Sequence, residues 1–421
     1  MFVRCSAIIL LLIGMALAIG NPEAAYTIPQ LITFYGYSYE EYNVTTSDAY
    51  ILGLYRVPTG LYSSYTGGPR PVMLLFHGLT EDGSEFLLNP GNASAALYFA
   101  DSGMDVYLAN FRGTPYALAN THLSSNARIA RFWDFSMDEF IALDATAIVD
   151  AVLNISGAPS LYITGHSQGA LVALSMLSAN VSYNAKDSCA IGKCSVGSFP
   201  VRGIFCWGGV SNSKHSTGLW AVAQDGGILS IAAAQAYAFA FGFQFPPTNP
   251  SLYAAAAALF CDGGLLSLIC QAGLSTLMGQ SKVVPQNTKR NDVLFSHFPS
   301  TTSIKNLEHW IELPKCPGTA NCKFDYGYFG NIAKYGTGIP PSYDFSLVTT
   351  KVWLYSGGQD TFGTPAETAA LQARLTGAGV LQDLTSIATY AHLDFVFAVD
   401  TPTQIYAPMV ATVNADFYGS G

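Results

Sequence analysis

Gly165-His166-Ser167-Gln168-Gly169 lies between a run of residues typical of a buried strand, 160–164, and a run typical of a helix, 170–178. A strand, the pattern G-x-S-x-G and a helix, in that order, predict a nucleophile elbow. The two glycines suit such a turn because a side chain at either position would block the close approach of strand and helix. The turn also forces the serine into a strained backbone conformation. Ser167 is therefore the candidate nucleophile of an α/β fold.

A serine hydroxyl is a poor nucleophile, so it needs a base to remove its proton and an acid to orient that base. In this fold the three groups follow the chain order serine, acid, histidine. The histidines after Ser167 are His215, His297, His309 and His392. His392 comes after the last strand-like segments, in a loop that could fold back over the edge of the sheet. It is the candidate base.

The acid is expected at the carboxyl end of the preceding strand. The segment 351–356 alternates as a strand does, and Asp360 follows in the turn after it. Asp394 stands two residues from His392 and would point away from it, whereas Glu367 is expected in the next helix. Asp360 is therefore the predicted acid. A solvated or capping role remains the alternative for each of these loop residues taken alone.

The oxyanion of a tetrahedral intermediate requires hydrogen-bond donors. The apolar segment 71–76 predicts a buried strand, and His77-Gly78-Leu79-Thr80 predicts a turn after it. We assign the donors to the backbone N–H groups of Leu79 and of Gln168, the residue after the nucleophile. An ordinary turn after a strand is the alternative interpretation of the first segment.

Further short sequence motifs occur along nearly the whole chain. In order they are 36–37, 40–41, 48–52, 75–79, 110–113, 132–136, 165–169, 324–327, 340–343, 356–360 and 392–395. Together they resemble the acid lipase family of α/β-hydrolases, the gastric and lysosomal type. The resemblance implies an α/β-hydrolase fold, that is, a mostly parallel doubly wound sheet with an inserted, mainly helical cap. It also implies a triad of Ser167, Asp360 and His392, with Leu79 and Gln168 as oxyanion donors.

Two segments depart from the family pattern. In 361–365, after the predicted acid, the family's bulky apolar residues and a further acid are missing, which leaves this loop smaller. The stretch from about 211 to 293 matches poorly. These departures affect the expected substrate range rather than the expected chemistry.

The length alone would allow two or three domains. Alternating apolar strands and helical stretches predict instead one sheet with an insertion. We divide the chain into a signal peptide (1–20), a first part of the core (21–210), a cap or lid (211–345) and a second part of the core (346–421).

The expected cap is strongly apolar. Between Asp225 and Lys282 the only charged residue is Asp262, and the segment includes the uncharged run 228–245. Three interpretations compete: a cap that lines an acyl-chain tunnel and meets a lipid interface, ordinary structural packing, and a transmembrane helix. Alanine, glycine and glutamine make the run marginal for spanning, so we expect no transmembrane span.

The amino terminus carries the features of a secretory signal peptide. Arg4 precedes an apolar core, 7–18, and small residues follow. A membrane anchor is the alternative, but a core of this length is too short to cross a bilayer. N-x-S/T sequons occur at Asn43, Asn92, Asn154 and Asn180. The sequence thus predicts a glycoprotein of the secretory pathway, either extracellular or in a lysosomal or vacuolar lumen.

Removal of the signal peptide would remove Cys5 and leave an odd number of cysteines. Short separations suggest the pairs Cys189–Cys194, Cys261–Cys270 and Cys316–Cys322, and the second resembles a disulfide in the family's cap. Cys206 lies in a strand-like run and is expected to be a buried, unpaired residue. No pair shows the spacing of a zinc site, so we expect no metal.

A net charge of −9 with only 11% charged residues disfavours nucleic acid as a partner. The predicted activity is hydrolysis of an ester through an acyl-enzyme, without any cofactor. By resemblance, the substrates are triacylglycerols, cholesteryl esters or related long-chain lipid esters at an oil–water or membrane interface. A carboxylesterase acting on soluble esters, an acyltransferase and a non-catalytic lipid-binding protein of the same fold are the alternatives.

Overall fold

The computed structural model describes residues 21–63, 65, 67–184, 200–246, 279 and 290–419. The predicted signal peptide lies outside these residues, and so do the expected disulfides Cys189–Cys194 and Cys261–Cys270. Cys316 and Cys322 are joined by a disulfide, with their Cα atoms 5.8 Å apart. Cys206 is a buried free thiol, and burial raises its pKa.

One mostly parallel sheet organises the protein. Within the described residues, its nine strands follow the order β1-β2-β4-β3-β6-β7-β12-β13, and β5 pairs with β2. The strands from β4 to β13 in this order are parallel to one another, whereas β1, β2 and β5 pair in antiparallel fashion. The strands are β1 (Glu40–Thr45), β2 (Tyr50–Val57), β3 (Val72–Phe76), β4 (Asp105–Leu108), β5 (Ala119–Asn120), β6 (Leu161–His166), β7 (Val201–Trp207), β12 (Lys351–Gly357) and β13 (Leu381–Ile387).

The winding of the sheet reverses next to β3. The chain passes from β3 to β4 on one side and then returns to β6 on the other side of β3. In such doubly wound sheets, ligands bind outside the carboxyl ends of the strands at the point of reversal. The carboxyl ends of β3 and β6 are therefore where a functional site is expected.

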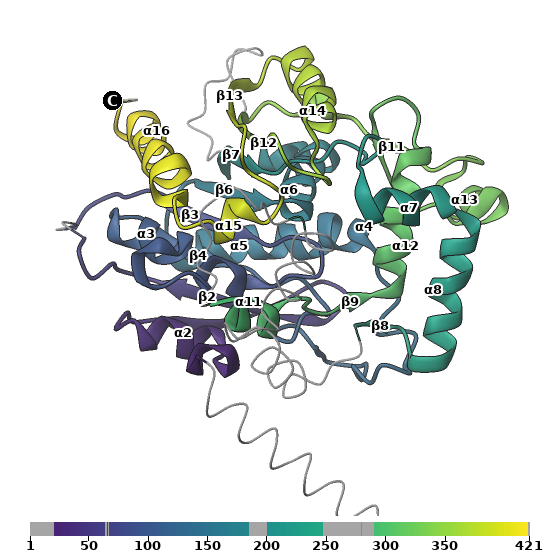
Figure 1. Ribbon diagram of the computed structural model, residues 1–421, viewed down its shortest axis with the longest axis horizontal. Coiled ribbons are helices and arrows are strands. Elements are labelled where there is room, and N and C mark those ends of the chain that lie inside the picture. Colours follow the sequence, from purple (N-terminus) through teal and green to yellow (C-terminus); the bar gives the residue numbers. More distant parts are fainter. Residues whose placement is uncertain are drawn as a thin grey trace, which may run out of the picture.

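Helices cover both faces of the sheet (Figure 1). Successive strand residues point to opposite faces, so Leu74 packs in one core cluster with α5, α6 and α14, and Met73 and Leu75 pack in another with α2, α3 and α16. A parallel strand buried on both faces appears in the sequence as a continuous apolar run, which is how β3 and β6 could be located, whereas β12 was located by its alternating pattern. The helices are α2 (Ile28–Phe34), α3 (Ala95–Asp101), α5 (Ala145–Ser156), α6 (Gln168–Ala179), α14 (Pro365–Gly377) and α16 (Ala407–Tyr418), with the short α4 (Met137–Glu139) and α15 (Asp394–Phe397).

The chain between β7 and β12 forms elements outside the sheet, and α7, α8, α12 and α13 gather on the right of Figure 1. Helices α8 and α12 pack against each other. Two short antiparallel pairs, β8 with β9 and β10 with β11, also belong to this segment. Its elements are α7 (Gly218–Gly226), α8 (Ile228–Phe241), β8 (Gln244–Phe245), α11 (Asn291–His297), β9 (Thr302–Ser303), α12 (Ile304–Glu312), β10 (Asn321–Cys322), α13 (Gly327–Tyr335) and β11 (Ser342–Tyr343).

Helix α8 is shorter than the apolar run 228–245 in which it lies. It contains 14 residues and ends where Gly242 takes a φ of 107°, a conformation that other residues rarely adopt. A transmembrane helix needs about 20 apolar residues. In the part of the chain that the structure describes, no helix is both long and apolar enough to cross a bilayer.

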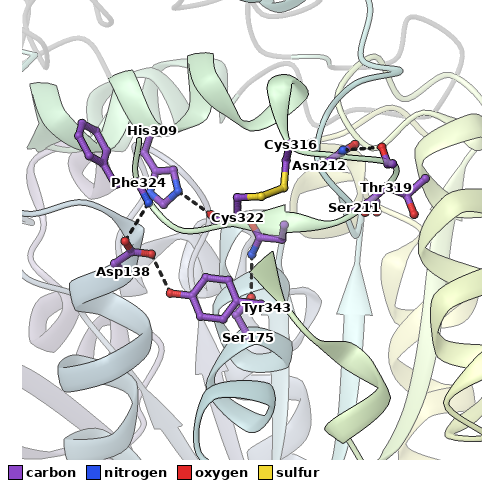
Figure 2. The surroundings of a disulfide bond; sticks show 12 residues. Asp138, Ser175, Ser211, Asn212, His309, Cys316, Thr319, Cys322, Phe324 and Tyr343 are labelled. Carbon is purple, nitrogen blue, oxygen red and sulfur yellow. Dashed lines mark hydrogen bonds between the residues drawn. A yellow bond between two sulfur atoms is a disulfide. The ribbon is translucent and has the colours of Figure 1, made fainter. Parts of the chain in front are cut away.

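The loop closed by Cys316–Cys322 is bound to two helices (Figure 2). Nδ2 of Asn321 donates to Oγ of Ser175 on α6 at 2.8 Å. Nε2 of His309 on α12 lies 3.0 Å from the carbonyl oxygen of Cys322. The disulfide loop therefore connects the segment after β7 to the helix that begins directly after Ser167.

The four sequon asparagines, Asn43, Asn92, Asn154 and Asn180, are all exposed. A glycan on any of them would not have to displace packed side chains. Their glycosylation remains a prediction.

Candidate active site

The turn around Ser167 has the strain that the sequence predicts. Ser167 joins β6 to α6 with φ 51° and ψ −115°, a region that non-glycine residues rarely occupy. A Cβ on Gly165 would lie 2.3 Å from the backbone nitrogen of Ala170, and one on Gly169 would lie 2.1 Å from the carbonyl oxygen of Phe76. Only glycine fits at either position, and the serine is thereby held at the carboxyl edge of the sheet.

Asp360 and His392 are brought together from two loops of the second half of the chain. Nδ1 of His392 lies 2.8 Å from Oδ2 of Asp360. The other carboxylate oxygen of Asp360 accepts hydrogen bonds from the N–H groups of Phe362 and Gly363, each at 2.8 Å. The small loop after Asp360 therefore fixes the carboxylate, which in turn orients the imidazole and makes its Nε2 the candidate for the base.

The side chains of His297 and His309 are engaged elsewhere, and His215 is exposed. Nε2 of His297 lies 2.9 Å from the carbonyl oxygen of Glu23, and His309 binds the disulfide loop. The backbone N–H of His215 donates to Oε1 of Glu367 at 2.6 Å.

The alternative acids have structural contacts of their own. Glu367 is fully buried at the start of α14, as expected for a helical residue, and its Oε2 accepts the N–H groups of Ser211 and Ser213, both at 3.0 Å. Oδ2 of Asp394 accepts the N–H of Ala391 at 2.7 Å. The sequence did not reveal the role of Glu367 in holding the start of the segment after β7, because no local spacing connects these positions.

Gly208, at the end of β7, lies against the Asp360–His392 pair. Its φ is 56°, and a Cβ there would lie 3.3 Å from Nδ1 and Cε1 of His392 and 3.4 Å from Oδ2 of Asp360. Nothing in the local sequence of this glycine signals its place in the site.

The loop after β3 is held by His77. Nε2 of His77 accepts the N–H of Phe111 at 3.1 Å, so Nδ1 carries the hydrogen and donates to the carbonyl oxygen of Gly78 at 2.9 Å. Burial lowers the pKa of His77, which agrees with a neutral ring. The fixed loop presents Leu79 to the same cavity as Ser167.

Gln168 is the first residue of α6, so its N–H has no acceptor within the helix. Its side chain is bound from the segment after β7. Oε1 of Gln168 accepts hydrogen bonds from Nδ2 of Asn306 at 3.0 Å and from Nε1 of Trp310 at 2.6 Å, both on α12. Helix α12 therefore helps to position the start of α6.

Ser167 and His392 line one cavity of about 490 Å³. Most of its walls are apolar side chains, and many of these come from α7, α8, α12 and the chain between them. Beside the two candidate catalytic residues it is lined by Leu79, Thr80, Glu81, Val210, Ser216, Trp220, Ala234, Phe245, Phe298, Pro299, Leu307, Trp310, Ile311, Phe362 and Leu393. The cavity suits a long apolar group with one polar point of attack.

A buried polar cluster that the sequence did not predict lies next to this cavity. Nδ1 of His166 lies 3.0 Å from Oε2 of Glu81 and 3.3 Å from Oε2 of Glu85. Within the described ranges these are the residues whose spacing would also admit a small cation. Because the imidazole and the carboxyl groups are already at hydrogen-bonding distance, we interpret the cluster as sharing protons rather than holding a metal.

Comparisons with known proteins identify the family. The profile of the family described as alpha/beta hydrolase fold matches residues 71–398, and that of the partial alpha/beta-hydrolase lipase region matches 28–90. Lipase lipl-1 from Caenorhabditis elegans is 32% identical over 399 residues, covering 94% of this chain and 93% of that protein. The chain belongs to the acid lipase family of α/β-hydrolases. The resemblance found in its sequence motifs is thereby confirmed.

Further relatives support the membership of this protein in the acid lipase family. Gastric triacylglycerol lipase from Homo sapiens is 30% identical over 405 residues, covering 94% of this chain and 93% of that protein. Among solved structures, a putative lipase from Sulfolobus solfataricus matches with a TM-score of 0.53 at 14% identity, covering 89% of this chain and 93% of that chain. This last likeness shows the α/β-hydrolase fold alone. As a member of the acid lipase family, the protein is a serine ester hydrolase of the lipase type.

Proposed function

We propose that this acid lipase family member hydrolyses long-chain neutral lipid esters, such as triacylglycerols and cholesteryl esters, through an acyl-enzyme on Ser167. The observation that carries the proposal is the Asp360–His392 pair, 2.8 Å apart, at the same apolar cavity as the strained Ser167. The gastric triacylglycerol lipases among the relatives support the substrate class.

In the proposed reaction, Oγ of Ser167 attacks the ester carbonyl carbon while Nε2 of His392 takes its proton. Asp360 holds the imidazole and stabilises its charged form. The N–H groups of Leu79 and Gln168 bind the oxyanion of the tetrahedral intermediate. The carbon–oxygen bond to the alcohol then breaks, and His392 gives the alcohol its proton. Water attacks the acyl-enzyme in the same way, its proton passes through His392 back to Ser167, and the fatty acid leaves.

We propose the segment 211–345 as a cap over this site. Its support is the contribution of α7, α8 and α12 to the cavity wall and the hydrogen bonds from α12 to Gln168. A cap of this kind excludes water from the acyl group and restricts entry to substrates that fit the apolar walls.

The outer surface of α8 is proposed to meet the lipid phase. Ile228, Leu229 and Phe239 are 81%, 78% and 90% exposed. Large exposed apolar side chains on one element favour a contact surface, and an enzyme that takes its substrate from a lipid interface requires one next to its cavity. Helix α8 also contributes Ala234 to the cavity wall, so the surface and the site share one element.

We propose that the protein enters the secretory pathway and acts outside the cell or in a lysosomal or vacuolar lumen. The four exposed sequons and the Cys316–Cys322 disulfide support this location, because disulfides persist in oxidising compartments.

The Ser167→Ala variant tests the proposed nucleophile. It should lose ester hydrolysis and covalent labelling by a long-chain phosphonate, because no other group can form the acyl-enzyme. Both are measured on emulsified triacylglycerol and cholesteryl ester, and the thermal unfolding midpoint of each protein serves as a folding control. A folded variant that still turns over would contradict the assignment.

The same assays distinguish the proposed lipase activity from the alternative functions. A carboxylesterase would prefer monomeric over emulsified esters, and an acyltransferase would give transesterified products with an added alcohol. A wild-type protein that neither reacts with the phosphonate nor hydrolyses any ester would be a binding protein.

A further inference from the structure

The proposed mechanism leaves unused three buried polar side chains directly behind the site. His166 precedes the nucleophile, and Glu81 and Glu85 follow the oxyanion loop. All three are at most 4% exposed. Burial of an imidazole and two carboxyl groups is costly unless they pair with one another, so their presence here calls for a function.

The side chain of His166 is hydrogen-bonded to the backbone of His392, the proposed catalytic base. Its Nε2 lies 3.0 Å from the carbonyl oxygen of His392. A carbonyl oxygen can only accept, so Nε2 carries a hydrogen and donates it. The two imidazole rings lie with their centres 5.1 Å apart. A change in the position of His166 would therefore move the backbone of His392.

Glu81 connects the same ring to the oxyanion loop. Its Oε2 lies 3.0 Å from Nδ1 of His166, and a Cβ on Gly78 would lie only 2.0 Å from that same oxygen. The Glu81 carboxylate thus packs against the Cα of Gly78, next to the proposed donor Leu79. One network therefore contacts the loop after β3, the elbow and the loop that carries His392.

The three groups have no net charge when His166 carries a hydrogen on both ring nitrogens, one glutamate is ionised and the other glutamate is protonated. Burial raises the pKa of Glu81, but the charge of His166 and a hydrogen bond from Glu85 outweigh it and lower the pKa of Glu81 to about 2. Burial and the charge of Glu81 raise the pKa of Glu85 well above its ordinary value. Burial lowers the pKa of His166, but both carboxyl groups outweigh it and raise that pKa well above the ordinary value. The resulting state is an imidazolium, one carboxylate and one neutral carboxyl group.

We propose that His166 is a positioning residue, held by Glu81 and Glu85, which fixes the backbone of His392 relative to Ser167 and the oxyanion loop. This inference rests on the proposed function and adds to it a second set of residues on which turnover depends. His166 touches neither substrate nor the reacting atoms.

The stability that these three groups contribute to the folded protein depends on pH. Glu85 and His166 bind protons more tightly in the folded protein, so the stability they contribute is present at acid pH and is lost as pH rises through their raised pKa values. Glu81 acts in the opposite sense and loses its contribution only as pH falls towards about 2. Other titratable groups that face the cluster are His77, His392 and Tyr406, and Asp82 lies behind His77.

A matched pair of substitutions at one position tests the positioning role. In H166Q the amide N–H reaches about as far as Nε2 and can still donate to the His392 carbonyl, whereas in H166N it reaches only as far as Nδ1. We expect H166N to lower kcat on a soluble short-chain ester by about 10²-fold at nearly unchanged KM, because misplacement of a catalytic group by about 1 Å costs that much. H166Q should recover at least about a tenth of wild-type kcat in the same assay. Wild-type kcat in both variants, or an equal loss in both, would overturn the proposal.

Glu85→Gln tests the shared proton without breaking the network, because a glutamine amide can donate to Glu81 as the neutral carboxyl does. Its kcat at acid pH should fall less than that of H166N, and its loss of activity at alkaline pH should begin about one unit higher or more. Glu312→Gln is the matched control, since burial raises the pKa of Glu312 to about 7 but the residue has no contact with His392.

The expected result is a displaced pH profile for E85Q alone. Identical profiles for wild type, E85Q and E312Q would overturn the proposal, and so would a stoichiometric divalent cation in the purified protein that E85Q no longer binds. A wild-type protein without any ester hydrolysis would instead refute the proposed function, so the two failures can be told apart.

Discussion

At the scale of single residues, the proposed catalytic pair depends on a glycine that takes no part in chemistry. Gly208 has a positive φ and lies within contact distance of both His392 and Asp360. A methyl group there would strain the backbone and push on the imidazole at the same time.

The Gly208→Ala variant should fold but lose kcat by up to about 10²-fold, because misplacement of a catalytic group by about 1 Å has that effect and the added methyl group both strains the backbone and presses on the pair. The measurement is kcat on a soluble ester, together with the thermal unfolding midpoint. Gly209→Ala is the neighbouring control, since a Cβ there would meet side chains of the core rather than the pair. Equal activity of G208A and wild type would show that the pair tolerates the contact.

Several of these residues could be predicted from the sequence and others could not. Ser167, Asp360 and His392 stand at strand ends in a fixed chain order, and the structure brings Asp360 and His392 to 2.8 Å. Gly208 and Glu85 carry no such signal, because their importance arises from contacts with residues distant in the sequence.

At the scale of elements, continuous apolar runs located the central strands β3 and β6 closely, since such strands face the core on both sides, whereas β4 and β13 were not predicted. The apolar run 228–245 gave no indication that its helix ends at Phe241, because the stop depends on the backbone conformation of Gly242. The hydrogen bonds from α12 to Gln168 could not be predicted from the sequence either, because they join parts of the chain about 140 residues apart.

The exposed surface of α8 gives a prediction at this scale. The double variant Leu229→Ser and Phe239→Ser should weaken adsorption to emulsified triacylglycerol by about tenfold or more, because burial of each side chain in an apolar phase contributes about 1.5–3 kcal/mol. Turnover of a soluble ester should stay at the wild-type rate, since neither residue lines the cavity.

Adsorption is measured by depletion of the enzyme from solution at increasing emulsion area. Tyr62→Ser is the matched control, because Tyr62 is 77% exposed in the loop after β2, outside the segment 211–345. A loss of the same size in the control would argue against a specific role for α8.

At the scale of the whole molecule, a buried ion cluster joins the loop after β4 to the start of α5. Arg112 is 1% exposed, and its Nε and Nη2 donate to Oδ1 of Asp144 at 2.8 and 2.6 Å. Its Nη1 donates to Asp48, in the turn between β1 and β2, at 2.6 Å. The sequence showed Arg112 only as part of a family phrase, and three distant segments had to fold before its contacts could exist.

Arg112→Met should lower the free energy of unfolding by about 3–5 kcal/mol, because it leaves the carboxylate of Asp144 buried without its partner. Thermal or denaturant unfolding followed by circular dichroism measures the loss. The double variant Arg112→Met and Asp144→Leu removes both charges and should recover part of the stability. If the double variant were as unstable as the sum of the two single variants, the pair would not be coupled.

The segment after β7 leaves the sheet and returns to it at β12, and β7 and β12 are hydrogen-bonded neighbours. Its two ends are therefore anchored side by side, so its length and composition can change without altering the order or the register of the sheet strands. Chimaeras that exchange this region between relatives should keep the strands and loops that carry the proposed catalytic residues while replacing the segment that covers the cavity. If the segment is the proposed cap, this topology allows the choice of substrate to change independently of the chemistry.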